Sequence, residues 1–297
     1  MSIRQIQNWV AGQELIAKDN VFLEKINPHS GHVESLFAAS SKADVGNAIG
    51  VACSAFNVWA DLTPVERGNL LAAWVRVLRS HQEELTEIVA RETGKPLPDA
   101  AGEVGAAFMQ GDFFAGEGMR LYARSLTSGM PGKYSHTVRQ PLGVAGLIVP
   151  ANTPIANIAW KVFPALICGN TVVLKASEDS PEIAQRIAQL SKDAGLPDGV
   201  FNVIQGEGDP AGKALVEDQR VAVISFTGST SVGRWIAEVA GRRLARVSLE
   251  LGGKNPFVVC DDANIDEAVK WASLSAFSNA GQRCASGSRI LVSEDIY

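Results

Sequence analysis

The sequence predicts an α/β fold with a doubly wound parallel sheet. Beyond residue 142, short runs rich in Val, Ile and Leu alternate with segments of helical pattern. Apolar strands separated by helices are typical of parallel β-α-β units, whose strands are covered on both faces. The chain has 297 residues, of which 46% are apolar, so it has the length for two domains or one large one and can bury a sizeable core.

The first 142 residues predict helices between short extended segments. Thr63 and Glu66 form a capping box at the start of one helix, and Ser80 and Glu83 repeat the pattern at the start of the next. Residues 125–142 break the helical pattern and predict a hairpin or an extended excursion. The other predictions for this part are short strands and turns over 1–40 and helices over 42–60 and 99–122.

Beyond residue 142 strands and helices alternate regularly. Predicted strands cover residues 143–149, 171–177, 199–205, 221–228, 247–253, 255–261 and 288–294. Predicted helices cover residues 154–168, 181–194, 210–218, 230–241 and 264–277. In such a sheet, ligands bind at the carboxyl ends of the strands, next to the amino termini of helices.

Composition and charge argue against several classes of function. The net charge of −5 gives no basic footprint for nucleic acid or for an anionic membrane. No apolar run is long enough to cross a bilayer, and the amino terminus lacks the apolar core of a signal peptide. The four cysteines lie far apart and the four histidines form no cluster with them, so we expect reduced thiols, a cytoplasmic location and no metal site.

Polar residues follow the predicted strands where a ligand would bind. Asn152 follows residues 143–149, and Lys175 and Glu178 stand at the end of the next strand. An amide can donate a hydrogen bond into a site, and a carboxylate with a lysine can hold the hydroxyls of a ribose. A turn asparagine and a solvated ion pair are the alternative interpretations.

Glycines follow two later strands. The stretch GEGDPAG contains Gly208 and Gly212 in a GxGxxxG spacing, which indicates either a dinucleotide loop or an ordinary glycine turn. After VISF, Gly228 and Ser229 precede a helix, which is typical of a phosphate-binding turn and also of a plain helix cap.

Several motifs together resemble the aldehyde dehydrogenase superfamily. They are ETGKP (92–96), PANTP with AWKVFPALICGNTVVLKASE (150–178), FTGSTSVG (226–233), LELGGKNP (249–256) and NAGQRCASGSR (279–289). The resemblance covers essentially the whole chain and implies a Rossmann-like fold with a protruding β-hairpin and the start of a second α/β catalytic domain. The implied divisions are an NAD-binding domain over 1–124 and 143–250, an oligomerisation hairpin over 125–142 and the beginning of the catalytic domain over 251–297.

The resemblance also implies a role for each site residue. Cys284 is the nucleophile that forms a thiohemiacetal with an aldehyde, and Glu250 activates the water that hydrolyses the resulting thioester. The Asn152 amide and the Cys284 N–H form the oxyanion hole. The cofactor is NAD, with NADP possible, because the carboxylate of Glu178 favours a free 2′-hydroxyl. The implied cofactor-binding residues are Lys175, Ser177, Glu178, Gly208, Gly212, Phe226, Gly228, Ser229 and Leu251.

The walls of the substrate site depart from the family pattern. Ala151 and Thr153 stand where the family usually has a tryptophan and another aromatic residue. Arg283 either recognises an acidic or polar substrate, helps to hold the thiolate, or turns away into a salt bridge. Asn157 and Trp160 line one wall or take part in ordinary helix packing.

Two alternative functions remain open beside an NAD-dependent aldehyde dehydrogenase. Family members continue well past the catalytic cysteine, so we expect an amino-terminal portion of an enzyme that assembles as a homodimer or homotetramer. A catalytically incomplete NAD-binding fragment is the first alternative. A CoA-acylating or thiol acyl-transfer enzyme is the second, and Glu250 argues against the CoA-acylating type because CoA removes the need for a hydrolytic base.

Overall fold

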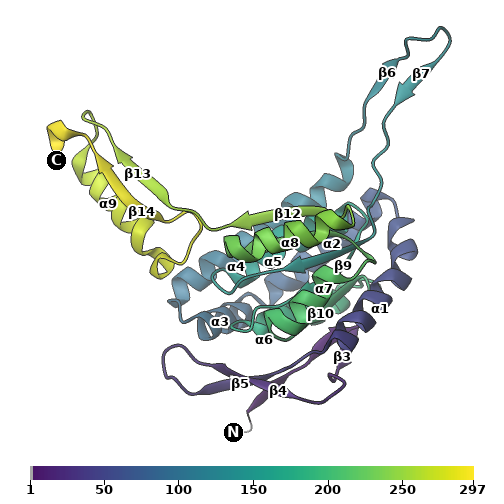
Figure 1. Cartoon of the computed structure of the whole chain (residues 1–297), viewed down its shortest axis with the longest axis horizontal. Coiled ribbons are helices and arrows are strands. Elements are labelled where there is room, and N and C mark those ends of the chain that lie inside the picture. Colours follow the sequence, from purple (N-terminus) through teal and green to yellow (C-terminus); the bar gives the residue numbers. More distant parts are fainter. Residues whose placement is uncertain (1–2) are drawn as a thin grey trace.

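The computed structural model describes residues 3–297 as an α/β protein (Figure 1). Its strands are β1 (Arg4–Ile6), β2 (Asn8–Val10), β3 (Gln13–Leu15), β4 (Phe22–Ile26), β5 (Val33–Ala38), β6 (Ser125–Thr127), β7 (Tyr134–His136), β8 (Val144–Ile148), β9 (Thr171–Lys175), β10 (Phe201–Ile204), β11 (Val221–Gly228), β12 (Arg246–Leu251), β13 (Asn255–Val259) and β14 (Gly287–Val292). Its α-helices are α1 (Lys42–Ala60), α2 (Pro64–Ser80), α3 (Gln82–Thr93), α4 (Leu97–Gly116), α5 (Pro154–Ile167), α6 (Pro181–Asp193), α7 (Lys213–Glu217), α8 (Thr230–Arg242) and α9 (Ile265–Phe277).

A seven-stranded sheet forms the centre of the molecule, with the strand order β12-β11-β8-β9-β10-β2-β3. The strands from β12 to β10 are parallel, and β2 and β3 extend the sheet in antiparallel fashion beyond β10. Helices lie on both faces of this sheet (Figure 1). The predicted doubly wound parallel sheet is therefore confirmed.

The order of the strands creates a reversal between β8 and β11. From β8 the chain passes through α5 to β9 and through α6 to β10, and it then returns to place β11 on the other side of β8. Ile148 at the end of β8 pairs with Phe226 near the end of β11. Ligands of open α/β sheets bind outside the carboxyl ends of strands at such a reversal.

Two apolar clusters cover the two faces of the sheet. One cluster joins alternate residues of the strands to α2, α4, α5 and α6, and Trp74 lies at its centre, with its ring centroid 4.8 Å from Phe163 and 5.5 Å from Phe201. The other joins the intervening strand residues to α1, α7 and α8. This division follows from the strand geometry, in which successive side chains point to opposite faces.

Two segments extend from this body. Strands β6 and β7 pair as an antiparallel hairpin that projects outwards, and all of their residues are exposed (Figure 1). Strands β13 and β14 pair in parallel with α9 beside them, and no residue of α9 is buried. Apolar side chains such as Trp271 and Phe277 therefore face outwards in the second segment. The role of the hairpin in assembly and the domain divisions remain predictions.

Most predicted elements agree with the observed ones to within a few residues, and the differences have local causes. The capping box at Thr63 and Glu66 forms, with Thr63 Oγ1 accepting from Glu66 N at 3.2 Å. The box at Ser80 is wrong, because Ser80 is the last residue of α2 and its hydroxyl donates to Val77 O at 2.7 Å. The helix predicted over 99–122 ends at Gly116 and continues only as a 3-10 turn.

Among residues 3–297, no single helix is both long and apolar enough to cross a membrane. By length and composition, only α1 and α2 taken together pass that test, across a bend of 118°.

Candidate active site

A cavity of about 490 Å³ brings Asn152 and Cys284 together. It lies between the amino-terminal parts of α4 and α5 and the loop that joins α9 to β14. Trp160 and Arg283 also line it, and Trp160 has 60% of its surface exposed. Arg283 forms no salt bridge among residues 3–297, so the alternative in which it turns away into an ion pair is not found in this part of the protein.

Hydrogen bonds fix both the peptide and the side chain of Asn152. Its carbonyl oxygen accepts from Lys95 Nζ and from Asn279 Nδ2, each at 2.9 Å. Its side-chain oxygen accepts from Thr153 N at 2.9 Å, and its amide nitrogen donates to Gln282 O at 2.8 Å. A side-chain amide carries two N–H donors, so one remains for a ligand in the cavity.

A buried ion pair that the sequence patterns did not reveal stands behind Asn152. Lys95 pairs with Glu103, and their side chains are 4% and 5% exposed. Glu103 also accepts from Ile155 N at 3.0 Å and Ala156 N at 3.3 Å, at the amino terminus of α5. Burial raises the pKa of Glu103, and Lys95 opposes this shift. The sequence did contain a signal for this pair. The helical period places Glu103 on the same face of α4 as Ala100, which is the face that packs into the core.

The loop that carries Cys284 is held from two sides. Asn255 donates from its side chain to the carbonyl oxygen of Cys284. Asn279 and Ala280 adopt left-handed backbone conformations, with φ of 53° and 56°, in the turn just before it. Residues in this region often mark functional turns. Within the described chain the Cys284 N–H has no acceptor, so it is free to serve as a donor together with Asn152.

Glu250 does not line the cavity of Cys284. It is exposed on β12, where it pairs with Thr227 of β11. Lys161, on α5, donates from Nζ to Ser225 Oγ at 2.7 Å. Burial lowers the pKa of Lys161 to about 8, and the carboxylate of Glu250 acts against this shift. Sequence reasoning missed Lys161, although a lysine within the apolar helix PIANIAWKVFPALI was an available signal.

The predicted ribose-binding pair forms at the end of β9. Lys175 Nζ lies 2.9 Å from Glu178 Oε1, and the lysine side chain is buried whereas the carboxylate is partly exposed. Burial lowers the pKa of Lys175, and Glu178 opposes the shift. Ser177 is also buried, and its hydroxyl accepts from Asp179 N at 3.3 Å. A partly exposed carboxylate that is oriented by a buried lysine can accept hydrogen bonds from a ligand.

The two glycines of GEGDPAG occupy different environments. Gly208 lies beside the Lys175–Glu178 pair, since a β-carbon built on it would be 4.0 Å from Glu178 Oε1. Gly212 is buried at the start of α7, and its N–H donates to Glu207 O at 3.3 Å. Gly208 is thus at the edge of the candidate cofactor site, whereas Gly212 belongs to the adjoining turn.

Gly228, at the end of β11, has no room for a side chain. A β-carbon on Gly228 would lie 2.4 Å from Cζ of Phe226, whose ring is buried beneath it. Ser229 is the exposed N-cap of α8, and its hydroxyl accepts from a first-turn N–H at 3.3 Å. Leu251 packs against Gly233 of the same helix. Phe226 and Leu251 therefore support the turn from below, while Gly228 and Ser229 form its outer surface.

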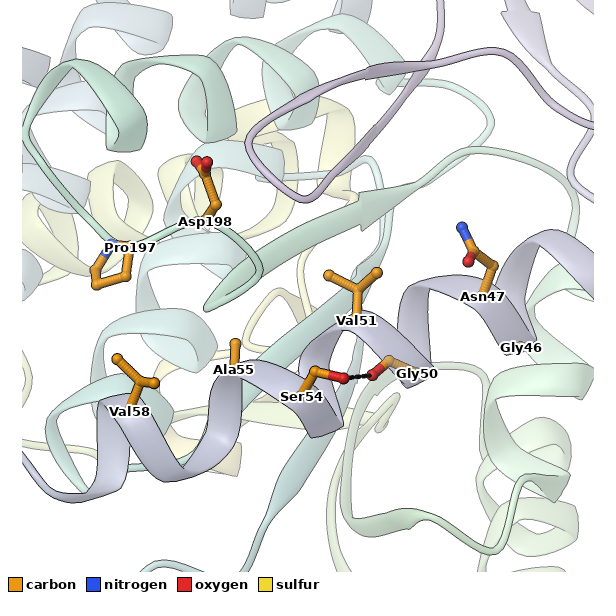
Figure 2. Close-up of a pocket in the computed structure, with 9 residues that line it drawn as sticks. All are labelled: Gly46, Asn47, Gly50, Val51, Ser54, Ala55, Val58, Pro197 and Asp198. Carbon is orange, nitrogen blue, oxygen red and sulfur yellow. Dashed lines mark hydrogen bonds between the residues drawn. The ribbon is translucent and has the colours of Figure 1, made fainter.

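A second cavity, of about 640 Å³, lies along α1 and the turn at Pro197 and Asp198 (Figure 2). Its wall consists mainly of small and aliphatic side chains such as Val51, Ala55 and Val58. Among its lining residues only Asp198 is charged, and none is a nucleophile with an adjacent base. The smaller cavity at Cys284 is therefore the candidate active site.

The described cysteines and acidic residues form neither a disulfide nor a candidate metal site. All four cysteines are free and exposed. Residues 3–297 contain no group of three or more His, Cys, Asp or Glu side chains that is arranged to hold a metal ion.

Comparison with known proteins identifies the family. The profile of the aldehyde dehydrogenase family matches residues 15–297. Succinate-semialdehyde dehydrogenase of Arabidopsis thaliana, a mitochondrial protein, is 39% identical over 98% of this chain and 55% of its own length. The NADP-dependent succinate-semialdehyde dehydrogenase GabD of Escherichia coli is 37% identical over 98% of this chain and 60% of its own length.

A solved structure agrees with these relatives. The NAD-dependent aldehyde dehydrogenase of Sinorhizobium meliloti superposes with a TM-score of 0.96 at 38% identity, over 98% of this chain and 59% of that chain. The chain thus spans somewhat more than half the length of the proteins it matches. The match across nearly every residue, together with the cavity that joins Asn152 to Cys284, leads to one conclusion: this chain belongs to the aldehyde dehydrogenase family.

Proposed function

We propose that this chain oxidises an aldehyde to a carboxylic acid with NAD or NADP, through a covalent intermediate on Cys284. The observation that carries the proposal is the shared cavity of Cys284 and Asn152 beside the β8–β11 reversal. An exposed thiol next to a free amide N–H is what nucleophilic attack on a carbonyl requires. The small residues around Cys284 leave room for a substrate to reach the sulfur.

The oxyanion site is the main electrostatic element of the proposed mechanism. When the sulfur of Cys284 attacks an aldehyde carbon, negative charge develops on the carbonyl oxygen. The free N–H of Asn152 and the backbone N–H of Cys284 are the donors available to it. Removing one such donor costs roughly 3–4 kcal/mol of transition-state stabilisation in enzymes of this type of chemistry.

The residues at the strand ends fit a dinucleotide. A bound NAD or NADP supplies the hydride acceptor, which no side chain can provide. Glu178, oriented by Lys175, would accept the ribose hydroxyls, and its charge favours NAD over NADP. Ser229 is the exposed N-cap of α8 at the end of β11, so a pyrophosphate could bind at the amino terminus of this helix.

Glu250 is proposed to activate the water that releases the acid. A hydrolytic step needs a base within reach of the acyl group on Cys284. Lys161 lies close enough to Glu250 for the two charges to interact, and its pKa of about 8 lets its charge change near neutral pH.

The proposed substrate is an aldehyde that carries a second anionic group. Arg283 brings a cation without an ionic partner among residues 3–297 to the wall of the cavity, directly before the nucleophile in the sequence. Guanidinium groups bind carboxylates through paired hydrogen bonds. The relatives named above act on succinate semialdehyde, an aldehyde of this class, which supports the same substrate class here.

Assembly and location complete the proposal. The exposed β6–β7 hairpin offers unpaired strand edges and apolar side chains such as Tyr134, which is 78% exposed. Exposed edges of this kind pair with another chain. We propose a cytoplasmic homodimer or homotetramer that uses this hairpin, and sedimentation of the chain with and without residues 125–142 tests the assembly.

The test of the proposed function is NADH formation by the chain with NAD and two aldehydes, succinate semialdehyde and benzaldehyde. Wild type is compared with Cys284→Ser, and with Cys53→Ser as a matched control at a cysteine outside the cavity. Turnover by wild type and Cys53→Ser, with none by Cys284→Ser, is the expected result. Equal turnover by all three proteins, or NAD binding without any turnover, would overturn the proposal.

A further inference from the structure

We infer that Lys95 and Glu103 are positioning residues that hold the Asn152 amide in place for the carbonyl oxygen of a substrate on Cys284. The inference rests on the proposed function, because it assigns a purpose to the pair only if Asn152 stabilises an adduct. It adds a role for two buried charges that take no part in the chemistry themselves.

The contact of Lys95 fixes the peptide to which the amide is attached. Lys95 Nζ donates to the carbonyl oxygen of Asn152 at 2.9 Å, and both residues line the cavity of Cys284. Rotation of this peptide would swing the side chain of Asn152, since the two share one Cα atom. The position of Lys95 itself is set by Gly94, which ends α3 in a left-handed conformation with φ of 74°.

The contacts of Glu103 fix the helix that follows Asn152. The first N–H groups of a helix need acceptors, and Thr153 at the N-cap of α5 provides no side-chain cap. Glu103 supplies that acceptor from α4, through Ile155 N and Ala156 N. One carboxylate therefore serves both as the cap of α5 and as the counter-ion of Lys95.

The same capping arrangement occurs elsewhere in the fold without an active-site contact. Glu92 is buried and accepts from Glu182 N at 2.7 Å and Ile183 N at 3.0 Å, at the start of α6. It does not line the cavity and does not contact Asn152. Glu92→Gln is thus a matched control that perturbs a buried helix cap without perturbing the oxyanion site.

The experiment measures adduct formation without the cofactor. The chain is incubated with succinate semialdehyde over a range of concentrations, and the rate at which iodoacetamide alkylates Cys284 is read by peptide mass spectrometry. The aldehyde concentration that halves this rate reports the stability of the thiohemiacetal. The exposed thiols of Cys53, Cys168 and Cys260 serve as internal standards. Thermal unfolding and NAD binding are measured on each variant.

We expect Lys95→Met to raise the half-protecting concentration by about 10- to 100-fold, because small displacements of a catalytic group have effects of this size. Asn152→Ala should raise it at least as far, Glu103→Gln should shift it in the same direction, and Glu92→Gln should leave it unchanged. Folded Lys95→Met and Glu103→Gln proteins that are protected like wild type would overturn the inference alone. An equal rise of the half-protecting concentration in Glu92→Gln would also overturn it, because the loss of any buried helix cap would then weaken the adduct. Absence of protection in wild type would overturn the proposed function and the inference with it.

Discussion

Gly228 offers a strict test of the contact between the core and the candidate cofactor site. In Gly228→Ala the new β-carbon would lie 2.4, 3.0 and 3.1 Å from three ring atoms of Phe226. The ring is only 6% exposed, so it cannot turn into solvent, and the end of β11 must shift instead. Overpacking of this kind costs about 1–3 kcal/mol, which lowers the Tm of a chain of this size by roughly 2–5 °C.

The same shift should disturb the turn that leads into Ser229. We expect NAD affinity to fall by at least about tenfold, which corresponds to ~1.4 kcal/mol. Gly241→Ala is the control, because Gly241 lies in α8, the helix that follows this turn, and a β-carbon added to it would meet no neighbouring group within 4 Å. Scanning calorimetry and NAD titration measure both effects. Wild-type Tm and wild-type NAD affinity in Gly228→Ala would refute the reasoning.

Three further changes probe other parts of the account. Thr63→Ala should lower the free energy of unfolding by about 1 kcal/mol through loss of the α2 cap, whereas Ser80→Ala, which removes no cap, should cost much less; equal losses in denaturant titrations would contradict this. The pKa of Lys161 is about 8 in the folded chain and ~10.4 in the unfolded chain, so between these values the unfolded chain binds the extra proton. The free energy of unfolding of wild type should therefore increase as the pH rises through that window. Lys161→Met should lack this gain, and parallel unfolding profiles of the two proteins would argue against it. Arg283→Gln should raise KM for succinate semialdehyde by about tenfold or more while leaving benzaldehyde unaffected, and an equal change for both aldehydes would remove Arg283 from substrate recognition.

Much of the fold was predictable because local and global signals agree. The apolar runs that become β8, β9, β10 and β11 are bounded by glycine, proline and capping residues, so their length and type follow from the sequence. The capping box at Ser80 failed because the pattern cannot tell whether a serine ends one helix or begins the next. The structure resolves that choice through the bond from Ser80 to Val77 O.

The candidate site was predictable where motifs lie at strand ends and not where it depends on pairing between distant segments. Asn152 and Cys284 meet as the motif pattern predicts, although 131 intervening residues separate them in the chain. Lys95 and Glu103 were missed because their partners lie at and just before the start of α5, about 50 residues further along. Lys161 was missed because its burial and its closeness to Glu250 arise only when α5 packs on the central sheet, where Lys161 reaches Ser225 of β11.

The most direct test of the account is the identity of the residue that carries the acyl group. Glu250→Gln is incubated with NAD and benzaldehyde, and its peptides are mapped by mass spectrometry beside those of Glu250→Gln/Cys284→Ser. The account predicts that a benzoyl group accumulates on Cys284 in the first protein and is absent from the second. A benzoyl group on Cys53, Cys168 or Cys260 instead, or no acyl group on a folded chain that binds NAD, would contradict it.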